Sequence, residues 1–358
     1  MKLVVLGLSL SSAWGNGHAT TYRALLRAFA GRGHDILFLE RDMPWYAAHR
    51  DEAAPDYCRL ELYDGVAALD RWRGEVAAAD AVIVGSYVPD GVAVGEWVQR
   101  HARGATAFYD IDTPVTLARL ARDDAEYLVP ALIPGFDLYL SFTGGPTLDL
   151  IEQRYGSPAA RALYCSVDAD AYRPLPVEKR WDLSYLGTYS DDRQPTLTRL
   201  LVDAARACPE RRFVVAGPQY PAAIDWPANV ERIEHLPPAE HAAFYSASRW
   251  TLNVTRADMI AAGWSPSVRL FEAAACGVPI VSDRWSGLDT LFAPGRAIVL
   301  ADTADEVIAA LTRPDAEAVG AAARAEVLAQ HTAQHRAAEL EALLGEAAAA
   351  PTRRVAVA

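Results

Sequence analysis

The sequence predicts an α/β protein built from two successive Rossmann-like domains that face each other across a cleft. Buried, strand-like runs alternate with amphipathic helical runs along the chain, which is typical of parallel sheets covered by helices. The 358 residues exceed one ordinary hydrophobic core and suffice for two. The alternation breaks at a segment that contains Pro174 and Pro176, and this break predicts the domain boundary.

The first domain is expected to span residues 1–172. Its strand-like runs are KLVVLGL, DILFLE, AVIVGS, TAFYDI and LYLSFT. The first run also resembles a weak signal peptide, since one lysine precedes a short apolar run that ends in small residues. We favour a buried first strand because the pattern continues unbroken into an amphipathic helix. The apolar face of that helix is formed by Tyr22, Leu25, Leu26 and Phe29.

The second domain is expected to span residues 173–345, and residues 346–358 are expected to form a loose C-terminal tail. Its strand-like runs are DLSYLGT, FVVAG, VERIEHL, TLNVT, PIVSD and AIVLAD. An Ala/Glu/Arg-rich helical tract, continuous or broken, follows over residues 315–348. Ligands of open α/β sheets bind outside the carboxyl ends of the strands, so the loops after the strands are where a site is expected.

Composition excludes several classes of function. The 46 acidic residues outnumber the 34 basic ones, and the resulting net charge of −12 argues against non-specific nucleic-acid binding. The four cysteines are scattered without a CxxC pair, which argues against a zinc knuckle or a disulfide framework and fits a reducing cytosol. No run approaches transmembrane length. We therefore expect a cytoplasmic protein, and no spacing of His, Asp and Glu predicts a metal site.

The segment SPSVRLFEAAACGVPIVSD predicts a helix with a polar face, followed by a buried strand. Ser265 is a suitable N-cap and Pro266 a suitable first residue, whereas Gly277 can end the helix in a left-handed conformation. Ser265, Arg269 and Glu272 fall at i, i+4 and i+7 and form one stripe. Free backbone amides and Arg269 suit a phosphate, and Glu272 suits the hydroxyls of a sugar or ribose.

Two other loops of the second domain carry candidate donor ligands. Gly187 and Thr188 follow its first strand, and Arg193 comes shortly after them. Glycine opens the backbone to a ligand, and a guanidinium there can clamp a diphosphate. A lone Arg193 would more simply be solvated or pair with Asp191 or Asp192, but Arg269 in the parallel position of another loop favours the clamp. Gly217 and Pro218 end the next strand, where a nucleotide border and a plain turn are equally plausible.

In the first domain, Gly15, Asn16 and Gly17 form a glycine-rich loop expected on the acceptor side. The loop lacks the third glycine of the GxGxxG fingerprint and is longer than that turn. Glu40 nevertheless ends the second strand, where a dinucleotide enzyme would hold a ribose. An NAD-dependent oxidoreductase is therefore an alternative.

Two residues of the first domain are candidate bases for an acceptor hydroxyl. His18 lies in the first turn of a helix, whose dipole would lower its pKa and keep it neutral; a lone histidine is more often a polar surface residue. In FYDIDTP, Thr113 and Pro114 suit the start of a helix that one of the two aspartates could support. Asp110, at the strand end, is the better candidate for meeting an acceptor hydroxyl.

Four segments resemble the GT-B glycosyltransferases, and in particular the bacterial CgeB-like (spore-maturation) group. They are SSAWGNGHATTYRALLRAFAGRGHDILFLERDMPWY, FYDIDTPVTL, SYLGTYSDDRQ and LNVTRADMIAAGWSPSVRLFEAAACGVPIVSDRWSGLDTLF. The resemblance covers nearly the whole chain, and its most specific part is the last segment, which is similar to the donor helix and following strand of family-4 transferases. VDADAYRP is similar to the hinge at which such chains enter the second domain.

The resemblance implies roles for individual residues. Glu272 matches the second glutamate of the family's E-x7-E motif, which is expected to bind the donor ribose. Arg193 and the preceding Gly187 match the diphosphate-binding loop. The first glutamate of E-x7-E, which in the family usually lies near the donor sugar, would fall at Trp264, so this chain departs from the family pattern there.

These observations lead to one hypothesis and two alternatives. We expect a metal-independent glycosyltransferase without a cofactor, which uses a UDP-, GDP- or dTDP-sugar as donor. Arg269 and Ser267 would share the phosphate contact, and the acceptor would be a small molecule, a glycan or a protein. Homodimer formation stays open. The alternatives are the oxidoreductase and a non-catalytic nucleotide-sugar-binding protein.

Overall fold

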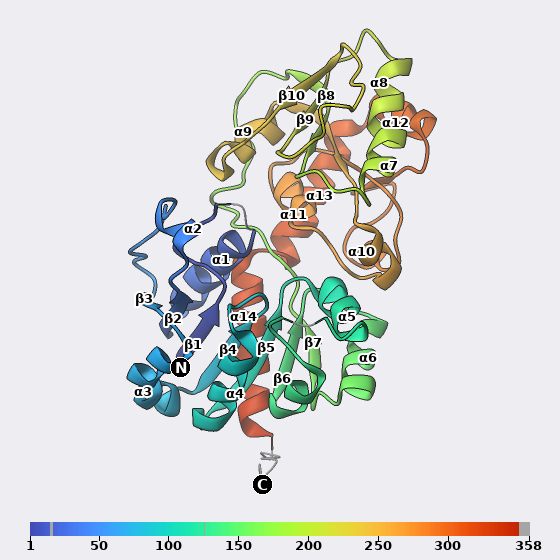
Figure 1. The fold of residues 1–358 in the computed structure, drawn as a ribbon. Coiled ribbons are helices and arrows are strands. Elements are labelled where there is room, and N and C mark those ends of the chain that lie inside the picture. The colour runs from blue at the N-terminus through green and yellow to red at the C-terminus, as the bar shows by residue number, and fades with distance from the viewer. Residues whose placement is uncertain (15–16, 125, 351–358) are drawn as a thin grey trace. The chain divides into compact units, whose positions relative to one another are not determined.

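The computed structural model describes residues 1–14, 17–124 and 126–350 and divides into two compact units. Unit 1 contains Met1–Ser166 and the chain from Ala333 onward, and unit 2 contains Val167–Thr332. Each unit holds one parallel sheet covered by helices, so the expected class of two Rossmann-like α/β domains is confirmed (Figure 1).

Unit 1 contains a seven-stranded sheet in the order β3-β2-β1-β4-β5-β6-β7, in which every pairing is parallel. Each expected strand is present, and two further strands, β3 and β7, extend the edges. The order reverses between β1 and β4, and such a reversal opens a crevice at the carboxyl ends of the strands. The strands are β1 (Lys2–Gly7), β2 (Asp35–Arg41), β3 (Arg59–Tyr63), β4 (Ala81–Gly85), β5 (Ala105–Asp110), β6 (Leu138–Ser141) and β7 (Ala160–Ala162).

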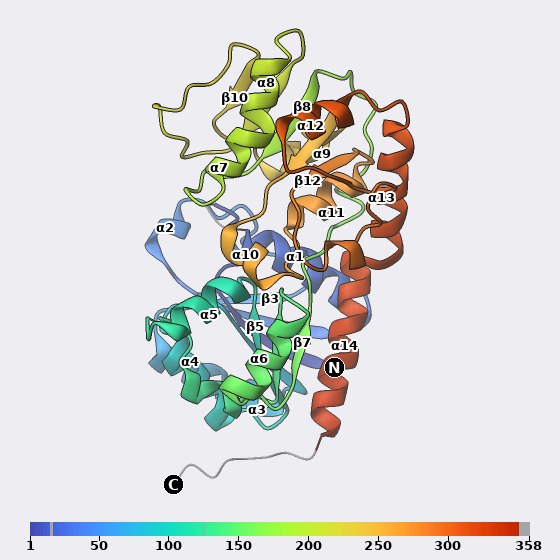
Figure 2. The ribbon, with the colours of Figure 1, turned by 90° about the vertical axis from the view of Figure 1, so that its right-hand side faces the viewer.

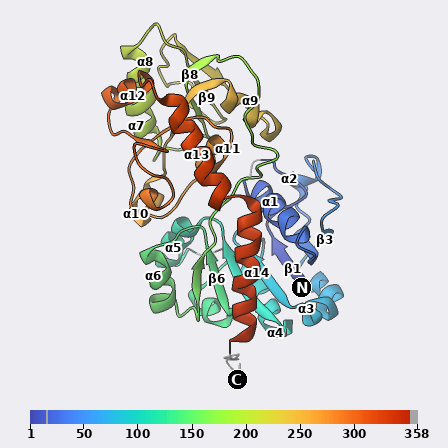
Figure 3. The ribbon, with the colours of Figure 1, turned by 180° about the vertical axis from the view of Figure 1, so that it is seen from behind.

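Helices cover both faces of this sheet. α1 (His18–Ala30) and α14 (Ala333–Ala349) lie side by side (Figure 3) and contact each other. α14 also contacts β5. The predicted apolar face of α1 is buried. α3 (Arg73–Ala78) and α4 (Gly91–His101) also contact each other and reach β1 and β4 respectively. The remaining helical segments are α2 (Pro44–Ala47), η1 (Val66–Trp72), α5 (Thr113–Ala121), η2 (Pro130–Gly135) and α6 (Pro146–Tyr155).

The first apolar run is a strand, as expected. β1 lies between β2 and β4, and Leu3, Val4, Val5 and Leu6 are buried. A strand buried on both faces is continuously apolar, which is why the same letters also resemble a signal peptide.

Unit 2 contains a six-stranded parallel sheet in the order β10-β9-β8-β11-β12-β13, with its reversal between β8 and β11. Each strand coincides with an expected run. The strands are β8 (Trp181–Leu186), β9 (Phe213–Ala216), β10 (Val230–Ile233), β11 (Ser248–Asn253), β12 (Ile280–Ser282) and β13 (Val299–Leu300).

The helices of unit 2 also form two layers. α11 (Val268–Ala275) contacts β11, β12, α9 (His241–Ser246) and α13 (Ala316–Gln330), and Figure 2 shows α11 beside α13. A second group packs together and shares a core with the sheet. That group contains α7 (Gln194–Leu197), a π-helical turn (Thr198–Val202), α8 (Asp203–Ala207) and α12 (Ala304–Leu311). η4 (Pro238–Glu240), α10 (Ala257–Ala262) and η5 (Leu288–Thr290) complete the unit.

The domain limits differ from those expected. The chain leaves unit 1 after Ser166, whereas the prolines placed this boundary after residue 172. The C-terminal helical tract breaks at residues 331–332, and α14 belongs to unit 1 because its buried side packs on α1 and β5. The expected tail therefore begins inside a helix, since α14 extends to Ala349, and residues 351–358 lie outside the described part of the chain. Among the described helices, none combines the length and apolarity that crossing a bilayer requires.

Candidate functional site

The candidate donor site lies at the carboxyl edge of the unit 2 sheet, around the ends of β8, β9 and β11. The turns after β8 and β9 are joined by the backbone, because the Gly187 amide donates to Ala216 O at 2.9 Å and the Tyr189 amide donates to Pro218 O at 3.0 Å. Thr188 lies between these two bonded positions. The pairing brings the expected Gly187–Thr188 and Gly217–Pro218 turns together.

Both glycines of this pair are required by close contacts. A Cβ on Gly187 would lie 2.7 Å from Arg269 Nη2 and 2.8 Å from the Tyr185 hydroxyl, distances that real Cβ atoms essentially never show. Gly217 has a φ of +137°, and a Cβ there would lie 2.2 Å from Gly187 O. The absence of side chains therefore lets the Arg269 guanidinium lie against the turn.

Arg269 is buried, with 9% of its surface exposed, and is fixed on several sides. Its Nε donates to Leu186 O at the end of β8, and its Nη1 donates to Asn253 Oδ1 at 3.1 Å. The guanidinium also lies 4.9 Å from the centre of the Tyr185 ring, a cation–π contact. The helix-borne cation is thus held at the switch point between β8 and β11.

Asn253 is a residue of this site that the sequence did not single out. Its Oδ1 accepts from Ser267 Oγ at 2.9 Å as well as from Arg269, and its Nδ2 donates to Ser282 Oγ at 2.9 Å. Asp283 continues the network by accepting from the amide and hydroxyl of Thr255 at 2.7 and 2.8 Å. Burial raises the pKa of Asp283, and its hydrogen bonds oppose that shift. The signal for both residues was a polar side chain at the end of an apolar strand.

Arg193 lies beside the same turn and, among the described residues, forms no ion pair with Asp191 or Asp192. Its Nη2 donates to Thr188 O at 2.6 Å, and its Nε has no hydrogen-bond partner among the described residues. Asp192 lies 3.6 Å from Arg256 instead. Burial lowers the pKa of Arg193, and the positive charges of Arg269 and Arg256 lower it further. Cations gathered in this way are an arrangement that a bound anion would stabilise.

The donor helix begins later than predicted. α11 starts at Val268 with Ser267 as N-cap, not with Ser265, because Ser267 is the residue in extended conformation before the first helical turn. Ser265 is buried upstream of the helix. The predicted end is confirmed: Gly277 has a φ of +70°, and its amide donates to Ala274 O at 2.8 Å. With the Val278 amide bonded to Ala273 O, this is a Schellman motif.

Glu272 lies in a different polar surrounding from Arg269. It is 5% exposed, and its Oε2 lies 3.8 Å from Nδ1 of His241 on α9. The Tyr172 hydroxyl bonds the same His241 nitrogen at 3.2 Å. Trp264, where the family motif has an acid, has a φ of 41° and stacks its indole on Gly287. The described conformation therefore fills that position with a packed aromatic ring.

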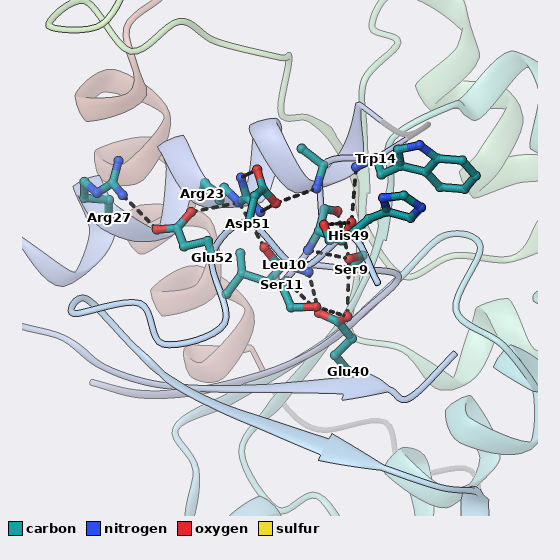
Figure 4. A network of polar contacts seen from close by, with 12 residues as sticks. Ser9, Leu10, Ser11, Trp14, Arg23, Arg27, Glu40, His49, Asp51 and Glu52 are labelled. Carbon is teal, nitrogen blue, oxygen red and sulfur yellow. Dashed lines mark hydrogen bonds and ion pairs between the residues drawn. The ribbon is translucent and has the colours of Figure 1, made fainter. Parts of the chain in front are cut away.

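In unit 1, Glu40 holds the loop after β1. Glu40 is fully buried, and its carboxylate accepts from the Leu10 amide at 2.7 Å, the Ser11 amide at 2.8 Å and the Ser11 hydroxyl at 2.6 Å (Figure 4). Ser9 Oγ adds a bond at 3.3 Å. The carboxylate is thus occupied by the protein itself, which is not what an NAD ribose would need.

Asp110 does not face a substrate space. It is fully buried and accepts from the Tyr139 hydroxyl at 2.5 Å, Thr116 Oγ1 at 2.8 Å and the Asp112 amide at 3.2 Å. Burial raises its pKa to about 6. The two aspartates therefore have roles opposite to those expected, since Asp110 supports the start of α5 and Asp112 is the partly exposed one.

His18, Tyr87 and Asp112 converge from the loops after β1, β4 and β5. The His18 and Tyr87 rings meet edge to face with centroids 5.3 Å apart, and the Tyr87 hydroxyl donates to Asp112 Oδ2 at 3.1 Å. Tyr87 has a φ of 63°, uncommon for a bulky residue. Burial lowers the pKa of His18 to about 4, and its Nδ1 has no hydrogen-bond partner among the described residues. Gly17 precedes His18, whereas Gly15 and Asn16 lie outside the described residues.

Comparison with known proteins bears on both units. Residues 193–342 match the family model described as glycosyl transferase-like. The chain has the two-domain GT-B fold. No curated protein sequence matches the chain.

Solved structures resemble the chain over almost its full length. A sucrose-phosphate synthase from Thermosynechococcus elongatus has a TM-score of 0.71 at 15% identity, covering 97% of this chain and 99% of that one. HepE from Anabaena in complex with UDP-glucose has a TM-score of 0.70 at 12% identity, covering 97% and 100%. An alpha-glucosyltransferase bound to UDP-glucose and DNA has a TM-score of 0.69 at 12% identity, covering 96% and 99%. At such identities the likeness establishes the fold.

Within the described ranges, no three His, Cys, Asp or Glu side chains are grouped closely enough to hold a metal ion.

Proposed function

We propose that this glycosyltransferase uses a UDP-sugar as its donor and binds it at the carboxyl edge of the unit 2 sheet. The observation that carries the proposal is the arginine pair at the β8–β11 switch point, where Arg269 lies against Gly187 and Arg193 reaches the adjacent Thr188. Two fold relatives were solved with UDP-glucose, which favours uridine over the other bases. Because four segments of the sequence resemble the CgeB-like glycosyltransferases, we propose that the chain belongs to that group.

The chemistry follows from charge. Transfer of the sugar leaves a nucleoside diphosphate that gains negative charge as the glycosidic bond breaks. Arg193, Arg269 and the amides at the start of α11 would stabilise that charge, with Gly187 and Gly217 allowing the phosphates close to the backbone. We infer that these groups supply the positive charge without a metal ion. Ser265 and Ser267 both lie just before this helix start.

Glu272 is proposed to bind the ribose hydroxyls. Its carboxylate is buried 3.8 Å from Nδ1 of His241, the nitrogen to which the Tyr172 hydroxyl is also bonded. A carboxylate accepts hydrogen bonds from two neighbouring hydroxyls, which is the pattern a ribose presents.

The acceptor is proposed to bind unit 1 near His18. His18 is neutral above pH 5 because of its lowered pKa, so its ring can accept a proton from an acceptor hydroxyl. Tyr87 and Asp112 lie beside it, and Asp112 replaces Asp110 as the carboxylate of this site. The oxidoreductase alternative is not favoured, since Glu40 is engaged by the loop after β1.

Turnover of UDP-glucose by the purified chain tests the proposal. We expect release of UDP, and the Glu272→Gln variant should lower kcat/KM by about tenfold or more because it loses charge-assisted bonds to the ribose. A Glu61→Gln variant, altered on the partly exposed strand β3, is the control. Binding without turnover of any UDP-, GDP- or dTDP-sugar would favour the non-catalytic alternative. Tight NADH binding would favour the oxidoreductase.

A further inference from the structure

A large aromatic ring stands exposed at the carboxyl edge of the unit 1 sheet. Trp14, in the loop after β1, is 53% exposed, although an indole of this size is normally largely buried. Its ring stacks on His49 with centroids 4.5 Å apart and planes 8° apart. We call this pair the Trp14–His49 platform. Figure 4 shows it at one end of the polar network around Glu40.

Hydrogen bonds with neighbouring residues hold both members of the platform in place. Ser12 Oγ donates to His49 O at 2.8 Å and accepts from the Trp14 amide at 3.2 Å, so one hydroxyl links the two members. The Ala13 amide donates to Asp51 Oδ1 at 3.1 Å, and Arg23 donates to both oxygens of Asp51 at 2.9 and 2.7 Å. An exposed ring that is oriented by such a network is a preorganised contact surface.

The position of the platform indicates its ligand. The loop after β1 flanks the β1–β4 switch point, where α/β sheets bind ligands, and His18 is the first residue of the helix that comes next in the chain. The proposed function requires an acceptor with a free hydroxyl at this edge, and the present inference rests on it. The electron-rich face of an indole attracts the C–H face of a pyranose ring.

The charges near the platform indicate which class of acceptor it would bind. Asp51 has 54% of its side chain exposed beside the platform, so its oxygens can accept hydrogen bonds from sugar hydroxyls. The net charge of −12 disfavours an anionic acceptor such as a nucleic acid. We propose that the Trp14–His49 platform is an acceptor subsite that stacks a pyranose ring of a neutral saccharide.

Binding of neutral saccharides to the full chain tests this subsite. The probes are methyl β-glucopyranoside, maltose, cellobiose and N,N′-diacetylchitobiose, each titrated by saturation-transfer NMR in the presence of UDP, with the flavonoid quercetin as a flat aromatic comparison. We expect at least one saccharide to bind and the Trp14→Ala variant to weaken that binding by about tenfold, the loss typical of one stacking ring. Trp14→Phe should retain most of the affinity.

Trp45 provides the matched control. It is 52% exposed in the same unit and is not part of the platform, so Trp45→Ala should leave saccharide binding unchanged. Equal affinity in wild type and Trp14→Ala, binding of none of the saccharides, or binding of quercetin alone would overturn the subsite. UDP binding, measured on the same samples, separates the two levels: a wild type that does not bind UDP refutes the proposed function, whereas UDP binding with no effect of Trp14 refutes only the subsite.

Discussion

Replacing Gly187 by alanine puts a methyl group into the contact between the β8 turn and Arg269. The new Cβ would lie 2.7 Å from Arg269 Nη2 and 2.8 Å from the Tyr185 hydroxyl. Arg269 cannot retreat without losing its bonds to Leu186 O and Asn253 Oδ1. Overpacking of this kind destabilises a fold by roughly 1–3 kcal/mol. We therefore expect Gly187→Ala to lower the free energy of unfolding by that amount and to shift the guanidinium out of the donor site.

Two measurements on one preparation check this prediction. Urea unfolding reports the stability, and calorimetric titration with UDP reports the donor affinity, which should fall by about tenfold because one charge-assisted contact is lost. Gly345→Ala is the control, since a Cβ at this position in α14 meets no atom within 4 Å. That variant should gain about 0.5–1 kcal/mol from helix propensity and bind UDP normally. Gly187→Ala with wild-type stability and affinity would refute the packing argument.

Two further predictions concern unit 1. Glu40→Gln should lower the free energy of unfolding by about 2–4 kcal/mol, because a side-chain amide group would then face the backbone amide donors of Leu10 and Ser11. Urea unfolding measures this change. The control variant Glu61→Gln should change the free energy of unfolding by less than about 0.5 kcal/mol. The pKa of Asp110 is raised from 3.8 to about 6, so the folded state holds the proton more tightly and wild-type stability should fall as pH rises from 4 to 7. Asp110→Asn removes this term, and the difference in unfolding free energy between variant and wild type should grow by about 2 kcal/mol over that interval. Parallel pH profiles of the two proteins would contradict the titration.

The sequence predicted the strands well because a short, continuous apolar run bounded by turns in an α/β chain usually forms a buried strand. The short edge strands β3 and β7 carry weaker patterns and were not expected. The sequence could not predict that α14 packs on unit 1 instead of unit 2. A helical pattern shows that one face of the helix is buried, but it does not show against which sheet.

The site was predicted in part for similar reasons. Gly187 and Gly217 signalled a turn, and the structure pairs their turns by backbone bonds that no spacing encodes. The capping residue was misplaced by two positions, since Ser265 and Ser267 are equally suitable N-caps in sequence. Asp110 was ranked above Asp112 because the sequence does not show that Tyr139 and Thr116 contact and bury Asp110.

The central claim is that a nucleoside diphosphate binds beside Arg193 at the carboxyl edge of the unit 2 sheet. Calorimetric titration of UDP into wild type, Arg193→Met and Arg180→Met tests it most directly. Arg180 is the control because it lies just before β8, at the opposite edge of the same sheet, and is 60% exposed. We predict that UDP binds wild type and Arg180→Met alike and binds Arg193→Met about tenfold or more weakly. Equal binding by all three proteins would contradict the claim.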